Sequence, residues 1–125
     1  MKVSEVMNKA FVIDDNISLK AAANLMSGKS VGSLIVMKKN RIIGIVTERD
    51  VMKNISKLNA KVSGVMSKNV ITIEKGDTVE DAAELMAAKK IKRLPVLGND
   101  ELVGIVTATD IIAHSEDLNE DFFFD

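Results

Sequence analysis

The sequence predicts an α/β fold made of two successive β-α-β-β-α repeats, and an internal duplication is the first observation behind this prediction. The stretch Gly104–Asp110 (GIVTATD) repeats Gly44–Asp50 (GIVTERD) 60 positions later. Of the 33 residues from 18 to 50, twelve are identical to the residue 60 positions further on. Average residue usage would give roughly two identities by chance. The second observation is that short apolar runs alternate with capped helical segments. We therefore divide the chain into repeats 1–59 and 60–118 and a tail, 119–125.

Composition limits the classes of protein that fit. The 125 residues are 46% hydrophobic and 28% charged, which is typical of a globular chain, and either half alone would bury too little apolar surface to be stable. We therefore expect the halves to share a core. The net charge of −1 makes nucleic acid an unlikely partner, and the absence of cysteine excludes disulfides and thiolate-bound metals. No apolar run is long enough to span a bilayer and no signal sequence is visible, so we expect a cytoplasmic protein without a membrane partner.

The first repeat is expected to begin with a helical turn and then follow the β-α-β-β-α order. Ser18 is a suitable N-cap for an amphipathic helix that Gly28 would end. Two almost continuously apolar runs separated by Lys38-Lys39-Asn40 predict an antiparallel pair of buried strands. The predicted elements are a helical turn at 2–7, a strand at 10–13, a helix at 19–27, strands at 33–37 and 41–47, and a helix that begins at Thr47 and carries Val51, Met52 and Ile55.

The second repeat predicts the same order. Thr78 and Asp81 form a capping-box pattern at the start of a helix. Pro95 lacks a backbone N–H, so its position within a strand predicts an edge strand or a strand start. The predicted elements are a short helix at 62–66, a strand at 70–73, a helix at 79–89, strands at 94–97 and 101–106, and a last helix from Thr107 to about 118.

The two Thr-x-x-Asp corners, Thr47 with Asp50 and Thr107 with Asp110, permit two interpretations. The structural one is a capping box, in which the carboxylate accepts the N–H of the capping residue. The functional one is a ligand site, because a carboxylate can accept both hydroxyls of a sugar diol and free N–H groups at a helix start attract phosphate. The occurrence of the corner in both repeats favours the functional interpretation without excluding the other.

The order of these motifs closely resembles that of the CBS domain, named after cystathionine β-synthase and usually found in tandem pairs. The resemblance covers residues 2–114, and it rests on the following segments: Val3–Met7, Ala22–Met26, Gly32–Val36, Gly44–Asp50, Ile91–Val96 and Gly104–Asp110. It implies two repeats related by a pseudo-twofold axis, with their sheets packed together and two clefts between them. It further implies a homodimer and a regulatory role in which an adenosine compound binds. AMP, ADP or ATP are the expected ligands and S-adenosylmethionine is possible, while no cofactor is required.

The resemblance also implies roles for individual residues. Asp110 and Asp50 would bind the ribose hydroxyls, Thr107 and Thr47 would lie near phosphate, and Lys92 and Arg93, just before Pro95, would face phosphate. The adenine would lie against Val70 and Ile71, or against Ala10 and Phe11 in the other cleft, with Ile105 or Ile45 on its other side. Lys92 and Arg93 are equally well explained as solvated surface charge.

The two repeats differ at the positions of Lys92 and Arg93, the residues expected to face phosphate. Gly32-Ser33 and Ile35 occupy the positions of Lys92-Arg93 and Pro95. The corner at Asp50 therefore lacks local cations, although Arg49 or Lys92 could compensate. We expect unequal sites, and the two alternatives are that both bind a ligand or that one is empty.

The remaining features indicate no catalysis. No nucleophile–base pair, metal-ligand cluster or glycine-rich phosphate loop is visible, so an enzyme is not expected. His114 is interpreted as a surface or packed residue. Phe122–Phe124 in the acidic tail either dock on the fold or its dimer partner or bind another protein. Two functions from different classes stay open: an adenosine-ligand sensor, and an assembly subunit with degenerate clefts that binds a partner protein.

Overall fold

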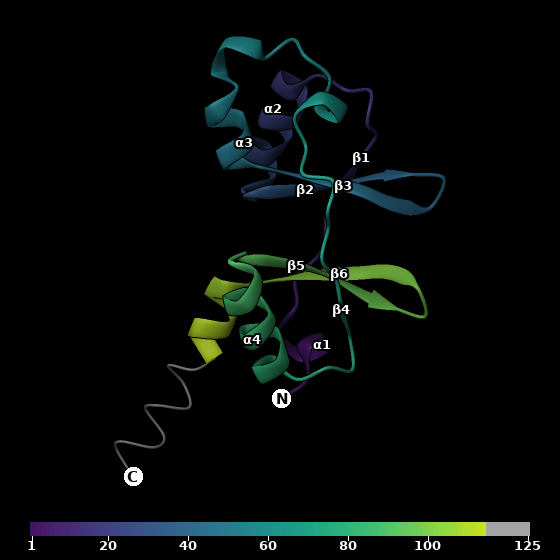
Figure 1. Cartoon of the computed structure of the whole chain (residues 1–125), viewed down its shortest axis with the longest axis vertical. Helices are drawn as coiled ribbons and strands as arrows, with labels where there is room; N and C mark the ends of the chain where they lie inside the picture. The colour runs from purple at the N-terminus through teal and green to yellow at the C-terminus, as the bar shows by residue number, and fades with distance from the viewer. Residues whose placement is uncertain (115–125) are drawn as a thin grey trace. The chain divides into compact units, whose positions relative to one another are not determined.

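The computed structural model describes residues 1–114, and its backbone forms two compact units (Figure 1). Of the described residues, unit 1 comprises 1–10 and 71–114, and unit 2 comprises Phe11–Val70. Each unit contains one three-stranded sheet with helices, so the α/β prediction is confirmed. The boundaries of the units differ from those of the sequence repeats, because each unit includes the opening segment of the other repeat.

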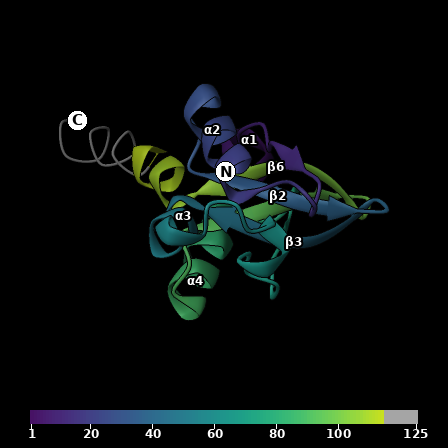
Figure 2. The ribbon, with the colours of Figure 1, turned by 90° about the horizontal axis from the view of Figure 1, so that it is seen from above.

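Unit 2 is a sheet with the strand order β1-β2-β3. Its elements are β1 (Val12–Ile13), α2 (Leu19–Lys29), β2 (Ser33–Lys38), β3 (Arg41–Thr47), α3 (Glu48–Lys53) and the 3₁₀ turns Ile55–Lys57 and Val62–Gly64. β1 pairs with β2 in parallel and β2 with β3 antiparallel, and α2 makes the crossover. The β2–β3 hairpin ends in a tight turn at Lys39 and Asn40, which both have positive φ (Figure 2).

Unit 1 repeats this plan in the order β4-β5-β6. Its elements are α1 (Val3–Val6), β4 (Ile73–Glu74), α4 (Val79–Lys89), β5 (Arg93–Gly98), β6 (Glu101–Thr107) and a helix at residues 108–114. Residues 115–118 of the predicted last helix lie outside the described residues, as does the tail. α4 has the predicted bounds, and the Thr78–Asp81 capping box that begins it is confirmed.

The opening segment of each repeat is bound by backbone hydrogen bonds to the other repeat's helix start. Val3 N–H donates to Asp77 O and Val79 N–H donates to Met1 O, at 2.8 and 2.9 Å. In unit 2 the corresponding bonds run from Val62 N–H to Ile17 O and from Leu19 N–H to Ala60 O, at 2.9 and 2.8 Å. The two repeats have therefore exchanged their opening segments.

Each unit has its own hydrophobic core, and the two repeats share both of these cores. In unit 1 the buried Val3 and Val6 pack with residues of β4, α4, β5 and β6. In unit 2 the buried Val62 packs with residues of β1, α2, β2 and β3. Both cores thus contain side chains from both repeats, so the exchange supplies apolar surface that a half-chain of this size lacks.

Two predictions about glycine and proline were wrong. α2 continues through Gly28, and Ser30 forms its C-cap with a φ of 54°. The helix end is fixed by the return of the chain to β2, where Val31 packs against the core and its N–H donates to Met26 O. Pro95 lies in β5, the central strand, and not at an edge. In unit 2 the equivalent Ile35 N–H donates to Phe11 O at 2.9 Å. Pro95 has no N–H to make this bond, and β4 pairs with β5 only from Val96 onward.

The short strands and turns also differ from their predicted bounds. β1 and β4 contain only two residues each. Only these residues pair with the neighbouring strand, β2 or β5. The predicted helix at 62–66 is a 3₁₀ turn at Val62–Gly64.

Candidate functional site

The Thr107–Asp110 corner lies where β6 ends and the helix at 108–114 begins. One carboxylate oxygen of Asp110, Oδ2, accepts hydrogen bonds from the Thr107 N–H at 2.9 Å and from the Thr107 hydroxyl at 2.8 Å. The Asp110 N–H donates to Thr107 Oγ1 at 3.2 Å. The capping-box interpretation of this corner is therefore confirmed. It does not exclude the ligand interpretation, because the second oxygen, Oδ1, is not used by the cap.

The Thr47–Asp50 corner has the same geometry at the junction of β3 and α3. Asp50 Oδ2 accepts from the Thr47 N–H at 2.8 Å and from the Thr47 hydroxyl at 3.2 Å. In both corners the threonine hydroxyl gives its proton to the aspartate. Either threonine would therefore have to give up that bond before its hydroxyl could donate to a phosphate.

The two corners differ at the second carboxylate oxygen. The side-chain amide of Asn8 donates to Asp110 Oδ1 at 2.9 Å. Asn8 is held there by β-bridge hydrogen bonds with Ile105, whose N–H and C=O bond to the backbone of Asn8 at 2.9 and 2.8 Å. In unit 2, Ser67 makes the same bridge with Ile45, at 3.0 and 2.9 Å. Within residues 1–114, the structure shows no hydrogen bond from the Ser67 side chain to Asp50.

Sequence reasoning missed Asn8. The signal was present in the second repeat frame, in which Met7 corresponds to Met66 and Asn8 therefore to Ser67. That frame shows that Asn8 and Ser67 are equivalent. It gives no sign that the Asn8 side chain bonds to Asp110, which is 102 positions away along the chain. Only the exchange of opening segments brings Asn8 to Asp110.

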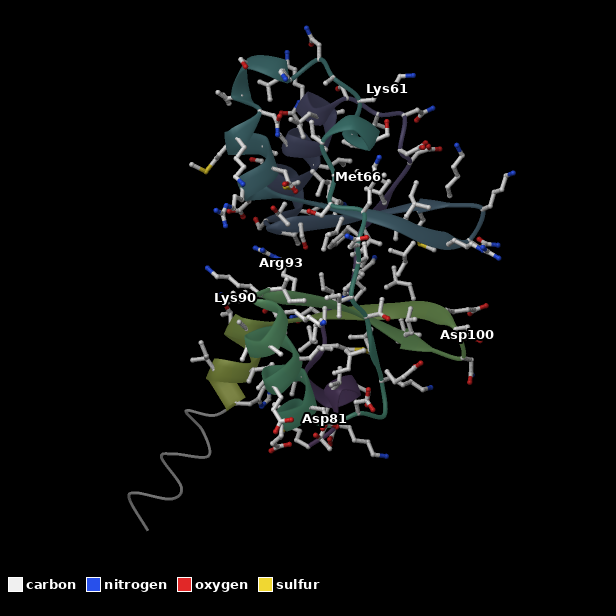
Figure 3. All side chains as sticks on the ribbon, viewed as in Figure 1. Lys61, Met66, Asp81, Lys90, Arg93 and Asp100 are labelled. Carbon is white, nitrogen blue, oxygen red and sulfur yellow. The ribbon has the colours of Figure 1, made fainter. Side chains whose placement is uncertain are left out.

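The backbone of the two predicted cations lies next to the Asp110 corner. Arg93 pairs with Thr107 across β5 and β6, and Ala108 N–H donates to the backbone oxygen of Lys92 at 2.8 Å. Ser33 pairs with Thr47 in the same way, and Glu48 N–H donates to Gly32 O. Arg93, which Figure 3 labels, lies at the start of β5. It is half-buried, whereas Lys92 is exposed. The two corners therefore differ in local charge: cations lie next to Thr107, whereas Gly32 and Ser33 lie next to Thr47.

The predicted apolar residues are distributed between the two units. Unit 1 contains Ala10, Ile71 and Ile105. Ile105 is 8% exposed and pairs with the fully buried Pro95. Unit 2 contains the remaining three, Phe11, Ile45 and Val70. The opening segment beside Ile105 is the one that leads to Ala10, whereas the segment beside Ile45 leads to Val70. Whether these side chains hold an adenine ring stays a prediction.

The other polar features indicate local structure. Asp14 and Asp15 lie in a turn, where Asp15 is 3.6 Å from the Lys38 ammonium. The pKa of Asp14 lies below its ordinary value, first because of hydrogen bonding with the Asp15 side chain and then because the Asn16 N–H donates to it. Within residues 1–114 no three His, Cys, Asp or Glu side chains are grouped so that they could hold a metal ion. None of the described helices is long and apolar enough to cross a membrane.

A family model of the CBS domain matches the chain twice, over residues 3–57 and 62–117. The chain belongs to the CBS domain family. A structural relative agrees: the CBS domain pair of the protein MJ0100, solved in complex with 5′-methylthioadenosine and S-adenosyl-L-methionine, is 26% identical with a TM-score of 0.87. That similarity covers 94% of this chain and 97% of the MJ0100 chain.

Relatives by sequence include longer proteins. The uncharacterized protein MJ1232 of Methanocaldococcus jannaschii is 32% identical over 90% of this chain, which spans 38% of that relative. An inosine-5′-monophosphate dehydrogenase of Thermoplasma acidophilum is 30% identical over 89% of this chain, which spans 23% of the dehydrogenase. This CBS chain therefore corresponds to about a quarter to two fifths of these two relatives.

Proposed function

We propose that this chain is a non-catalytic regulatory module that binds an adenosine compound, with AMP, ADP or ATP as the ligand, and transmits its presence to a partner protein. The observation that carries the proposal is the Thr–Asp corner found in both units. In each corner a half-buried carboxylate keeps at least one acceptor position on Oδ1 open while Oδ2 is fixed by the cap. A carboxylate held in this way is suited to accept the hydroxyls of a ribose.

The surroundings of the Asp110 corner support a nucleotide. Lys92 and Arg93 supply positive charge at the start of β5, where Arg93 pairs with Thr107 and the Lys92 oxygen accepts from the Ala108 N–H. Ile105 and Pro95 supply an apolar surface one step further into the sheet. A site with a few polar groups on a largely apolar lining is typical of small-molecule binding. The adenosine compounds bound by the MJ0100 pair support the same ligand class for this chain.

A thermal-shift screen tests the proposal. AMP, ADP, ATP, S-adenosylmethionine and NADH are added separately to the full chain and the melting temperature is measured. A ligand at about 100 times its Kd should add about 2.7 kcal/mol to the free energy of unfolding. The double variant Asp50→Asn/Asp110→Asn is the control and should show no shift, because asparagine can still cap the helix but is a poorer acceptor for a diol. If no compound shifts the wild-type melt, the proposal is refuted.

An assembly role is the second candidate, and an apolar groove in unit 2 favours it. The groove lies between α2 and α3, and Met26, Val31, Val51 and Met52 contribute to its lining. Met52 is 76% exposed and Ile55, which follows α3, is 66% exposed. Flexible methionines at an open surface suit a protein contact. We propose that a second copy of the chain covers this groove, so that the module is a homodimer.

A further inference from the structure

The two aspartates differ in how many hydrogen bonds they can still accept. An ionised carboxylate offers about four acceptor positions, two on each oxygen. In both corners the threonine N–H and hydroxyl use the two positions on Oδ2. At Asp110, the Asn8 amide uses one position on Oδ1. At Asp50, both positions on Oδ1 are open with respect to every residue from 1 to 114. Asp110 therefore has one acceptor position left where Asp50 has two.

This difference comes from the side chains and not from the backbone. Asn8 and Ser67 make equivalent β-bridges, with Ile105 and Ile45, of nearly equal length. The asparagine side chain extends one bond further than the serine side chain, and its amide reaches the carboxylate. The orientation of that amide is fixed by chemistry, because an amide oxygen turned toward the carboxylate would be repelled.

We propose that Asn8 is a specificity-determining residue that makes the two corners accept a ribose differently. Asp50 accepts both hydroxyls of the diol, whereas Asp110 accepts one and leaves the other to the neutral amide oxygen of Asn8 or to water. The inference rests on the proposed function, since it concerns how the same ligand class is recognised. Its consequence is that the Asp110 corner tolerates the loss of one ribose hydroxyl and the Asp50 corner tolerates neither loss.

The test compares AMP with its 2′-deoxy and 3′-deoxy analogues by calorimetry on the full chain. The Asp110→Asn variant leaves the Asp50 corner, and the Asp50→Asn variant leaves the Asp110 corner. At the Asp50 corner each analogue should bind about tenfold more weakly than AMP or worse, because each has lost a hydrogen bond to a charged acceptor. At the Asp110 corner one of the two analogues should bind within about threefold of AMP, because neutral and water-mediated bonds contribute less.

Replacing Asn8 provides the decisive variant. In the Asp50→Asn background, Asn8→Ser reproduces the residue of the other corner and should make both analogues bind about tenfold more weakly than AMP. The 2′,3′-dideoxy analogue has no diol, so its Kd should be the same with Asn8 and with serine. A change in the dideoxy Kd would show that Asn8 only supports the structure, and the inference would fall.

The remaining outcomes separate the inference from the proposed function. Equal penalties for the two analogues at both corners, with AMP bound, would overturn the inference and leave the proposed function intact. If neither single variant nor the wild-type chain binds any adenosine compound, the proposed function fails and the inference fails with it.

Discussion

At the scale of single residues, Asp50 and Asp110 show how one side chain can serve structure and binding together. Their Oδ2 atoms hold the helix cap, so the carboxylates are already fixed before any ligand arrives. A fixed carboxylate loses little side-chain entropy on binding, which favours affinity. The same double use means that substitution at either position changes stability as well as binding, and the two effects have to be measured separately.

The roles assigned to Asp110 and Lys92 predict different responses to the loss of phosphate from the ligand. Asp110→Ala should weaken adenosine and AMP alike, by about 1.5–3 kcal/mol, because both ligands carry the same diol. Lys92→Ala should weaken AMP but spare adenosine, and the loss should shrink as salt rises, since it is largely Coulombic. Calorimetric titrations at two salt concentrations measure both effects.

Two matched variants control that experiment. Asp81→Ala removes a capping carboxylate of the same type from the start of α4, outside both Thr–Asp corners, so it should cost about 1 kcal/mol of stability and no affinity. Lys89→Ala removes an exposed charge from the last turn of α4 and should leave both ligands unaffected. Equal losses of adenosine and AMP affinity in Lys92→Ala would show that Lys92 does not bind phosphate.

At the scale of elements, the glycine in each GIVT motif is explained by the opening segment that crosses it. A Cβ added at Gly104 would lie 2.7 Å from Met7 Sδ and 2.9 Å from the backbone oxygen of Asn8. A Cβ at Gly44 would meet Met66, which lies beside β3 in Figure 3, and would be 3.1 Å from the Ser67 oxygen. The glycine thus allows the opening segment to approach the strand that ends in the Thr–Asp corner.

Gly104→Ala should therefore destabilise the chain by about 1–3 kcal/mol, because the added methyl group overpacks a site where a backbone oxygen cannot move aside. Urea denaturation measures the change. Gly28→Ala is the matched control: no atom lies within 4 Å of its Cβ position in α2, so alanine should stabilise by about 0.4–1 kcal/mol. A neutral Gly104→Ala would contradict the close approach of the Met7–Asn8 segment.

At the scale of the whole molecule, the exchange of opening segments links two units that have separate cores. Each core needs a valine from the opposite repeat, Val3 in unit 1 and Val62 in unit 2, and both side chains are 0% exposed. A cut between the repeats would therefore leave each half without part of its core. This dependence explains how a sequence of two short repeats forms a stable chain.

The exchange predicts where a core substitution acts. Val3→Ala should cost about 1.5–3 kcal/mol, and native-state hydrogen exchange should lose protection in unit 1, for example at the Val79 amide that bonds to Met1. Val62→Ala is the reciprocal variant and should act on unit 2, at the Leu19 amide. If Val3→Ala reduced protection mainly at residues 11–70, the exchange of segments would be contradicted.

The proposed homodimer predicts the effect of a charge on the α2–α3 groove. Met52→Glu should convert the dimer to a monomer, since a charge buried at an interface without a partner is costly. Light scattering at micromolar concentration measures the mass. Val103→Glu is the control, because Val103 is an exposed valine on β6 outside this groove. A wild-type mass of one chain would remove the homodimer proposal.

The sequence by itself determined the parts of this protein that depend on neighbours along the chain. The duplication, the bounds of α4, the β2–β3 and β5–β6 hairpins and the capping boxes all follow from interactions a few residues apart. Turn residues and caps act locally, so their signals survive in a single sequence.

Only the tertiary structure decided which opening segment joins which repeat. Val3–Met7 and Val62–Met66 have nearly the same sequence, so local preference cannot choose between pairing with their own repeat and pairing with the other. The choice places Asn8 on Asp110, 102 positions away, and Ser67 near Ile45. It depends on contacts between residues distant in sequence, which residue patterns do not encode. The inequality of the two carboxylates follows from that choice.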